Sequence, residues 1–388
     1  MQEYIDEPMR LASNKDKNIL YLLVLLTYIP LTTMGNMIRI AVVGLLYVMK
    51  VSNSYVEPGV RKIARYMMIS PFVPLVFVFI NDGGISTGIV IHEIMRMAYC
   101  ALIIVVASTL DVDFKCIYTG TLLAFLPNFG IQIAQFLHVP GVTALIRSNY
   151  ITSDASEFSH LDLSLLTGAD FRAGSIYLNP NIFMVIPLLA LVVFLQQDYR
   201  KRNVINLVLI ACTAISLYFC GSRTGIVVLG FILILYSAKY LQGSKKILFV
   251  LFVVVAMLLV SRRIDSNARA LRLSAEDSGS LIVKFRGFLW YWTSTLSRPI
   301  YWLTGSIGAS NVVSIDCEWG HLYTWYGIFG IYWYIKYNKL AIKWNENIVF
   351  YSKPMTYVCM LCAITASVLL CMPIYSVVVV LLFAKLID

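Results

Sequence analysis

Carboxylate, imidazole and aromatic side chains come together in the segment from Ser314 to Trp325. Glu318, His321 and Trp325 are spaced i, i+3 and i+7, so a helix would carry all three on one face. A carboxylate and an imidazole on one face can supply a general base, for which Asp316 and Glu318 are the first candidates and His321 the next. The plainer interpretation is that Ser314 or Asp316 caps a helix and Glu318 matches the positive end of the helix dipole. That interpretation explains the carboxylates but leaves His321 without a role.

Two short arginine motifs are candidate anion sites. Residues 172–181 are RAGSIYLNPN, and they begin with Arg172 and lead into an apolar run. The Asn-Pro-Asn at its end, which includes Asn181, would break a helix and free backbone groups for a ligand. Residues 221–225 are GSRTG and place Arg223 at a helix N-terminus, where free N–H groups and the guanidinium both favour an anion. A helix-entry turn and a hairpin turn with a snorkelling arginine are equally good interpretations.

Aromatic and cationic residues are concentrated in the second half of the chain. All seven tryptophans lie within or just beyond residues 262–330. Arg286 and Trp290 stand in KFRGFLWYW, where an arginine could bind phosphate and an aromatic face could stack on a sugar ring. A belt of tryptophans at the membrane–water interface is the alternative.

Three further motifs point less clearly to a function. His92, Glu93 and Arg96 lie within an apolar run, where a charge indicates either function or a structural Glu93–Arg96 pair. Asp111-Val-Asp113 matches a pattern that holds divalent cations, but it is interpreted as a solvated turn. The cysteines stand mostly in apolar runs and are interpreted as small buried side chains.

The composition indicates which kind of fold must hold these residues in place. The chain has 388 residues, of which 59% are hydrophobic and 13% charged, with a mean hydropathy of +0.76. Soluble domains carry about 25% charged residues, so we expect an all-α polytopic membrane protein with about twelve transmembrane helices. The expected spans are residues 18–34, 37–50, 66–81, 87–110, 115–137, 176–196, 203–220, 223–239, 246–261, 318–335, 355–371 and 373–387. Because only Pro373 separates the last two, a re-entrant hairpin is the alternative there.

The distribution of lysine and arginine predicts the orientation. If the N-terminus is cytoplasmic, the inner loops are rich in lysine, as the positive-inside preference requires, so both termini are expected in the cytoplasm. The outer positions hold almost only arginine, which binds phosphate or carboxylate through two parallel hydrogen bonds. We therefore expect an anionic ligand at the outer boundary of the membrane. The two long outer loops are about 138–175 and 262–316, and residues 1–388 are expected to form a single integral membrane domain.

The order of these motifs resembles the bacterial O-antigen polymerase and ligase superfamily. RAGSIYLNPN before a span, GSRTG at the start of a later span and a long outer loop are similar to that family. The loop also shows an arginine-aromatic start at Arg286 and Trp290, a G-x-x-G at 305–308, and an acidic end before a second G-x-x-G at 327–330. The resemblance covers roughly residues 165–335.

Ligases of this superfamily usually show a His-Asn pair where this chain has Asp316-Cys317-Glu318, and this departure favours the polymerase branch. The resemblance implies a C-type glycosyltransferase membrane fold in the bacterial inner membrane. It implies a polymerase that joins oligosaccharide repeat units linked to undecaprenyl pyrophosphate into O-antigen or another surface polysaccharide, in lipopolysaccharide biosynthesis. The active site would face the periplasm, and the growing chain would be the donor and a single repeat unit the acceptor.

The implied reaction is an inverting glycosyl transfer without metal or other cofactor. Arg172, Arg223 and Arg286 would hold the leaving phosphates, with Asn181 and Trp290 also in the binding site. The expected partners are the two lipid-linked substrates, membrane lipid and a chain-length regulator, and no nucleic acid.

Two alternatives remain open at this point. One is a ligase that transfers glycan to a lipid A core. The other is a transporter that flips the lipid-linked unit, although transporters usually show repeat symmetry and paired broken helices at the midplane. Here the polar motifs collect on one face instead.

Overall fold

The structure is a computed structural model of the whole chain. The residues that it describes are 13–30, 32–52, 54–82, 86–137, 139, 141–142, 144–146, 173–177, 180–201, 203–243, 247, 279–307, 309, 317–348, 350–366, 368 and 371–387.

Most of the described chain is helical. In chain order the elements are α1 (Asn14–Leu25), η1 (Leu26–Tyr28), α2 (Thr33–Val51), α3 (Pro58–Ile69), α4 (Phe72–Asp82), α5 (Thr87–Ser108), β1 (Asp111–Val112), α6 (Phe114–Phe136), η3 (Ser175–Tyr177), α9 (Pro180–Phe183), α10 (Val185–Arg200), α11 (Val204–Cys220), α12 (Arg223–Tyr240), α14 (Gly279–Ser294), α15 (Tyr301–Thr304), α16 (Glu318–Lys343), α17 (Ser352–Cys362), α18 (Met372–Phe383) and β2 (Lys385–Leu386).

An all-α membrane protein is therefore confirmed in outline. Within the described ranges, five helices are long and apolar enough to cross a membrane. They are Thr33–Val51, Pro58–Asn81, Thr87–Ser108, Phe114–Phe136 and Asn181–Arg200, and the shorter apolar helices are Val204–Cys220, Thr224–Tyr240 and Met372–Phe383. The expected total of twelve stays a prediction, because most of the expected span 246–261 lies outside the described residues.

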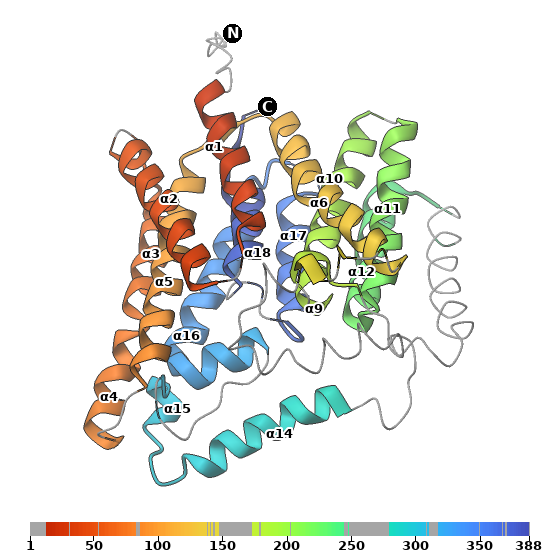
Figure 1. Cartoon of the computed structure of the whole chain (residues 1–388). Helices are drawn as coiled ribbons and strands as arrows, with labels where there is room; N and C mark the ends of the chain where they lie inside the picture. Colours follow the sequence, from red (N-terminus) through yellow and green to blue (C-terminus); the bar gives the residue numbers. More distant parts are fainter. Residues whose placement is uncertain are drawn as a thin grey trace.

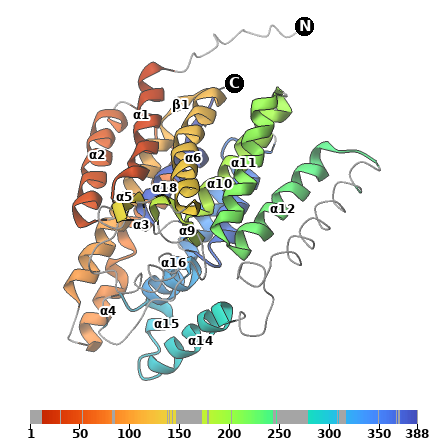
Figure 2. The same cartoon turned by 45° about the vertical axis from the view of Figure 1, so that its right-hand side comes forward.

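The two ends of the described chain lie at one end of the helix bundle, at the top of Figure 1. The N–H of Asp111 donates to Asp16 Oδ2 at 3.2 Å, and Asp16 also pairs with Lys50 at 2.6 Å. β1 and β2 pair in parallel, with Asp111 opposite Lys385. We call this the strand end. α14 and α15 lie at the other end, which we call the α14 end, in both views (Figures 1 and 2).

The Asp-Val-Asp motif belongs to the strand end and has a structural role. Asp113 caps α6, because its Oδ1 accepts the N–H of Cys116 at 2.8 Å. Its other carboxylate oxygen lies 3.8 Å from Lys17 Nζ. These contacts agree with the interpretation of the motif as a turn.

Two helices form the centre of the bundle. Every residue of α18 is buried, and so is α10 from Val185 to Gln196. A helix that is apolar all round has no polar face to present to water, so it is most stable with other helices on every side. α18 contacts α5, α1, α10 and α6, and this buried centre positions the α14 end.

The expected span at 318–335 falls on α16, which is not one straight helix but bends sharply at Gly327. The backbone there is non-helical, with φ 60° and ψ −152°. The rings of Trp319 and Tyr334 are 4.8 Å apart, whereas residues fifteen apart in a straight helix are separated by about 22 Å. The first segment of α16, residues 318–326, therefore folds back on the second, residues 328–343. Sequence periodicity predicts a helix here but not this bend.

The bend depends on two glycines that pack against each other's backbone. A Cβ on Gly327 would collide with the carbonyl of Leu303 and with the N–H of Gly305. A Cβ on Gly305, which also has a positive φ of 82°, would collide with the carbonyl of Trp325. Neither position tolerates a larger residue without movement of the backbone.

α17 and α18 fit the predicted re-entrant alternative at the end of the chain. Their eleven and twelve residues correspond to about 16 and 18 Å, well short of the ~30 Å hydrocarbon core. α18 returns to the strand end, where β2 follows it. The segment between the two helices reaches the start of α16, where the N–H of Glu318 donates to the carbonyl of Ala363 at 3.1 Å.

Replacement of Gly327 by alanine is expected to destabilise the protein. A positive φ and a collision with the Leu303 carbonyl together cost on the order of 2 kcal/mol or more. The measurement is the thermal unfolding of detergent-purified protein. The matched control is Gly44→Ala in α2, where a Cβ would meet nothing within 4 Å and alanine is expected to be neutral or stabilising by about 0.5–1 kcal/mol. Equal melting temperatures for the two variants would contradict the role given to Gly327.

Candidate functional site

The two arginine motifs meet at the α14 end of the bundle. The N–H of Ala173 donates to the carbonyl of Phe219 at 2.9 Å, so the first motif lies against the last turn of α11. Arg172 itself lies outside the described residues, but it is joined directly to Ala173. Phe219 precedes Arg223 by four residues. The backbone at Ala173 is therefore held beside the end of α11, four residues before Arg223, although the two segments are far apart in sequence.

Three amide side chains of α6 fix this meeting point. Gln132 Nε2 donates to the carbonyls of Ala173 and Ser216, at 2.9 Å each. Gln135 Oε1 accepts the N–H of Ser175 at 2.9 Å, and Ser175 Oγ donates to Asn128 Oδ1 at 2.7 Å. All of these groups are buried, and Ser175 has a positive φ of 55°.

Asn128, Gln132 and Gln135 were missed by the sequence reasoning. Their spacing of four and three residues on an apolar run puts them on one helix face, which was a usable signal. Because a buried amide must find partners, such a row indicates where a polar segment enters the bundle.

The second motif forms the predicted turn between two helices. Gly221 ends α11 in the left-handed conformation, with φ 55°, and Ser222 caps α12 by accepting the N–H of Gly225 at 3.3 Å. Ser222 Oγ also lies 2.9 Å from Met184 Sδ, at the junction of α9 and α10. Arg223 is the first residue of α12, and its side chain lies outside the described part. The positive end of the α12 dipole is therefore directed at the α14 end.

The Asn-Pro-Asn motif had two interpretations of equal weight, a helix break and a helix-entry turn. Pro180 is the first residue of α9, a position where its missing N–H removes no hydrogen bond. α9 continues into α10 through Met184, whose φ of −52° and ψ of −21° are helical. The helix-entry interpretation is the correct one. Asn181 is half-buried in this first turn.

The third motif opens α16. Asp316 lies outside the described residues, and the cap is Cys317 instead of Ser314 or Asp316, because Cys317 Sγ accepts the N–H of Gly320 at 3.3 Å. Glu318 is almost fully buried, and its carboxyl is hydrogen-bonded to Tyr334 on the second segment of α16.

His321 joins a buried cluster with residues of α5. Glu93 is fully buried and forms an ion pair with Arg96, one turn along the same helix. The hydroxyl of Tyr326 donates to Glu93 Oε2, and His321 Nε2 lies 3.5 Å from the same oxygen. The His321 ring also stacks near Trp325, with centroids 4.3 Å apart. The predicted common face of His321 and Trp325 is therefore confirmed.

This cluster connects two motifs that sequence reasoning treated separately. The Glu93–Arg96 pair forms, as the structural interpretation predicted, and the guanidinium of Arg96 lies 5.9 Å from the Trp325 ring centroid. His92, beside them, is half-exposed, with Nδ1 3.7 Å from Glu93 Oε1. The cluster holds the first segment of α16 against α5 near the α14 end.

The start of α18 lies between the cluster and the first arginine motif. α18 packs against α5, which carries the cluster, and against η1, and Tyr99 of α5 is hydrogen-bonded to Ser376 of α18. Tyr177 is hydrogen-bonded to Thr27 of η1. The Glu93 cluster and the first arginine motif therefore both lie next to the hairpin formed by α17 and α18.

Arg39, near the start of α2, has a structural role. Its guanidinium is fully buried and donates to the carbonyls of Leu26, Ile29 and Pro30 and to Asn36 Oδ1. These carbonyls belong to the chain between α1 and α2, so Arg39 stabilises that connection.

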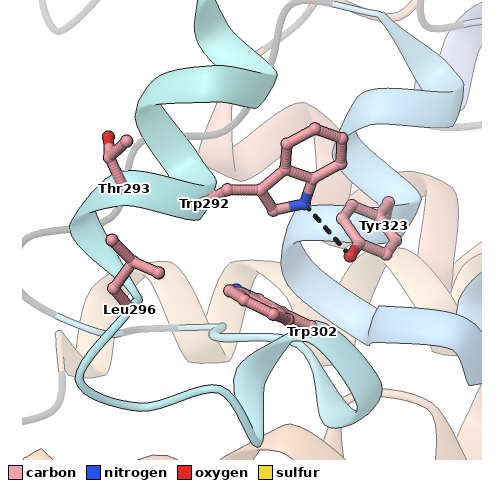
Figure 3. Close-up of a pocket in the computed structure, with 5 residues that line it drawn as sticks. All are labelled: Trp292, Thr293, Leu296, Trp302 and Tyr323. Carbon is pink, nitrogen blue, oxygen red and sulfur yellow. Dashed lines mark hydrogen bonds between the residues drawn. The ribbon is translucent and has the colours of Figure 1, made fainter.

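An aromatic pocket opens between α14, α15 and the first segment of α16 (Figure 3). It has a volume of about 410 Å³ and is lined by Trp292, Thr293, Leu296, Trp302 and Tyr323. The indole N–H of Trp292 donates to the Tyr323 hydroxyl at 3.3 Å, as the dashed line in Figure 3 marks.

Tyr291 is the buried residue that holds α14 in place. Two predicted site residues, Arg286 and Trp290, lie on the exposed side of the same helix. Tyr291 is buried and donates to the carbonyls of Tyr301 and Thr324, at 3.0 and 3.3 Å, and burial raises the pKa of Tyr291 to about 12. Arg286 and Trp290 are both exposed. Both side chains lie on the open side of α14, and their role in binding stays a prediction.

Among the residues that the structure describes, no group of three or more His, Cys, Asp or Glu side chains is placed to hold a metal ion. Comparison of the chain with protein-family models, with curated proteins and with solved structures gave no match.

The Glu93–Arg96 pair generates a stability prediction. Arg96→Gln leaves a carboxylate buried without its cation, which is expected to cost on the order of 3–5 kcal/mol. The double variant Glu93→Gln/Arg96→Gln removes both charges and is expected to be the more stable of the two. Thermal unfolding of the single and double variants in detergent measures the difference. A double variant that loses as much as the sum of the two single variants would show that the residues are not coupled.

Proposed function

We propose that this chain is a glycosyltransferase that polymerises lipid-linked oligosaccharide repeat units at the outer face of a bacterial inner membrane. In this proposal the strand end is cytoplasmic and the α14 end faces the periplasm. The observation that carries the proposal is the contact of the segment 173–177 with the end of α11, just before the turn at 221–225.

An anionic leaving group fits this meeting point. Arg172 and Arg223 flank it in sequence, and the N-terminus of α12 adds unpaired N–H groups and the positive end of a helix dipole. A pyrophosphate carries the charge and the acceptor oxygens that guanidinium groups bind best. Because the outer face has no nucleotide sugars, the donor sugar has to arrive already activated on a lipid such as undecaprenyl pyrophosphate.

The proposed reaction is an inverting displacement. An acceptor hydroxyl attacks the anomeric carbon of the donor while Arg172, Arg223 and Arg286 stabilise the departing phosphates. Of the predicted bases, Asp316, Glu318 and His321, the last two lie on the first segment of α16. Asn181 and Trp290 remain candidate substrate contacts at the same end.

The aromatic pocket beside α14 supports a glycan substrate. Trp292, Trp302 and Tyr323 present ring faces there, and such faces pack against the apolar face of a sugar. The neighbouring exposed residues Leu289 and Trp290 suit the membrane–water boundary.

Removal of Arg172 or Arg223 is expected to weaken polymerisation. Each charge-assisted contact to phosphate is worth roughly 1.5–3 kcal/mol, so alanine should lower the rate roughly tenfold to a few hundredfold. The measurement is the polysaccharide ladder on a gel from cells that carry each variant, at equal protein level. The matched control is Arg61→Ala in α3, an exposed arginine whose helix starts near the strand end, which should leave the ladder unchanged.

The same polysaccharide ladder, read in a strain that lacks this protein, distinguishes a polymerase from a ligase. Loss of a polymerase leaves single repeat units on the lipid A core, whereas loss of a ligase leaves the core bare. An unchanged ladder in both arginine variants, at normal protein level, would contradict the pyrophosphate site.

A further inference from the structure

We propose that His321 is the general base and that Glu93, on α5, is the positioning residue that orients it. This inference rests on the proposed glycosyl transfer and deepens it. It selects one base among three candidates, and it gives a role to a buried carboxylate that lies 228 positions away in sequence.

Two groups fix the His321 ring from different directions. Nε2 lies 3.5 Å from Glu93 Oε2, and the ring centroid lies 4.3 Å from that of Trp325. A hydrogen bond from Nε2–H to Glu93 selects the tautomer whose lone pair is on Nδ1, the nitrogen that would accept a proton. An imidazole held by a carboxylate in this way is a recurring arrangement for a base.

Glu93 is itself held in place, which a positioning residue requires. Arg96 pairs with one of its oxygens, and the Tyr326 hydroxyl donates to the other. The side chain is fully buried, so water does not compete for these contacts. Arg96 holds the carboxylate in place, and a carboxylate beside an imidazole can stabilise the imidazolium that forms when the ring takes a proton.

The other described carboxylate of the motif is placed for a different role. Glu318 is bonded to Tyr334, and its backbone N–H donates to Ala363 of the hairpin. These contacts connect the start of α16 to the bundle interior. His321 lies one turn further along the first segment of α16, which also carries Tyr323 of the aromatic pocket.

The proposed step moves one proton and exchanges one bond at the anomeric carbon for another. The acceptor O–H bond breaks and its proton goes to His321 Nδ1, while the oxygen forms a bond to the anomeric carbon of the donor. The bond from that carbon to the pyrophosphate oxygen breaks, and its electron pair leaves with the pyrophosphate. His321 then returns the proton to solvent or to the released phosphate.

The test uses purified full-length protein in proteoliposomes with lipid-linked repeat units, and measures kcat and KM for new glycosidic bonds. His321→Gln is expected to lower kcat by roughly 10²- to 10⁴-fold, which is the usual contribution of a general base. The double variant Glu93→Gln/Arg96→Gln removes the carboxylate without leaving a buried charge, and should lower kcat by roughly 10- to 10³-fold with little change in KM. Glu93→Asp keeps the charge and should restore part of the rate.

The matched control is Tyr99→Phe, which removes a different buried hydrogen bond of α5, to Ser376. Its kcat should stay close to that of the wild type. A folded double variant with kcat within about twofold of the wild type would overturn the inference, and so would an equal loss in Tyr99→Phe. A wild-type protein that forms no bonds from lipid-linked units would overturn the proposed function, and this inference with it.

Discussion

A carboxylate buried in an apolar helix bundle must be neutralised, and the rest of this fold follows from how Glu93 meets that requirement. Arg96 supplies the charge from the same helix, but Tyr326 and His321 reach Glu93 only because the first segment of α16 lies against α5. That segment can lie there only if α16 reverses direction, and Gly327 is the residue that permits the reversal. One ion pair, one bend and one helix contact therefore depend on each other.

Composition and charge were sufficient to predict the class of the fold, because burial of apolar surface and satisfaction of backbone hydrogen bonds leave few other choices in a membrane. The bend in α16 and the short helices α17 and α18 were harder to predict. Hydropathy measures how apolar a run of residues is, but it does not show whether the chain continues straight or turns back. The G-x-x-G at 327–330 was visible in the sequence, but only the backbone contact between Gly305 and Gly327 explains it. Residues that lie outside the described ranges, such as most of the expected span 246–261, leave the total number of spans a prediction.

The candidate site was predictable as a set of local motifs, but their partners were not. Periodicity correctly placed His321 and Trp325 on one face, because that depends only on helix geometry. It could not connect His321 to Glu93, since that contact depends on how two distant helices pack. The same limit applies to the amides of α6, which hold residues 173–177. Nor could the sequence show that Arg39 binds backbone carbonyls of the chain between α1 and α2.

The central claim is that this chain forms glycosidic bonds between units that are already activated on a lipid. Purified protein in proteoliposomes, supplied only with an oligosaccharide unit on undecaprenyl pyrophosphate and no nucleotide sugar, tests this claim most directly. The account predicts lipid-linked glycans of two or more repeat units, detected by mass spectrometry. Movement of the unit across the bilayer without any new glycosidic bond would contradict it and would support a transporter.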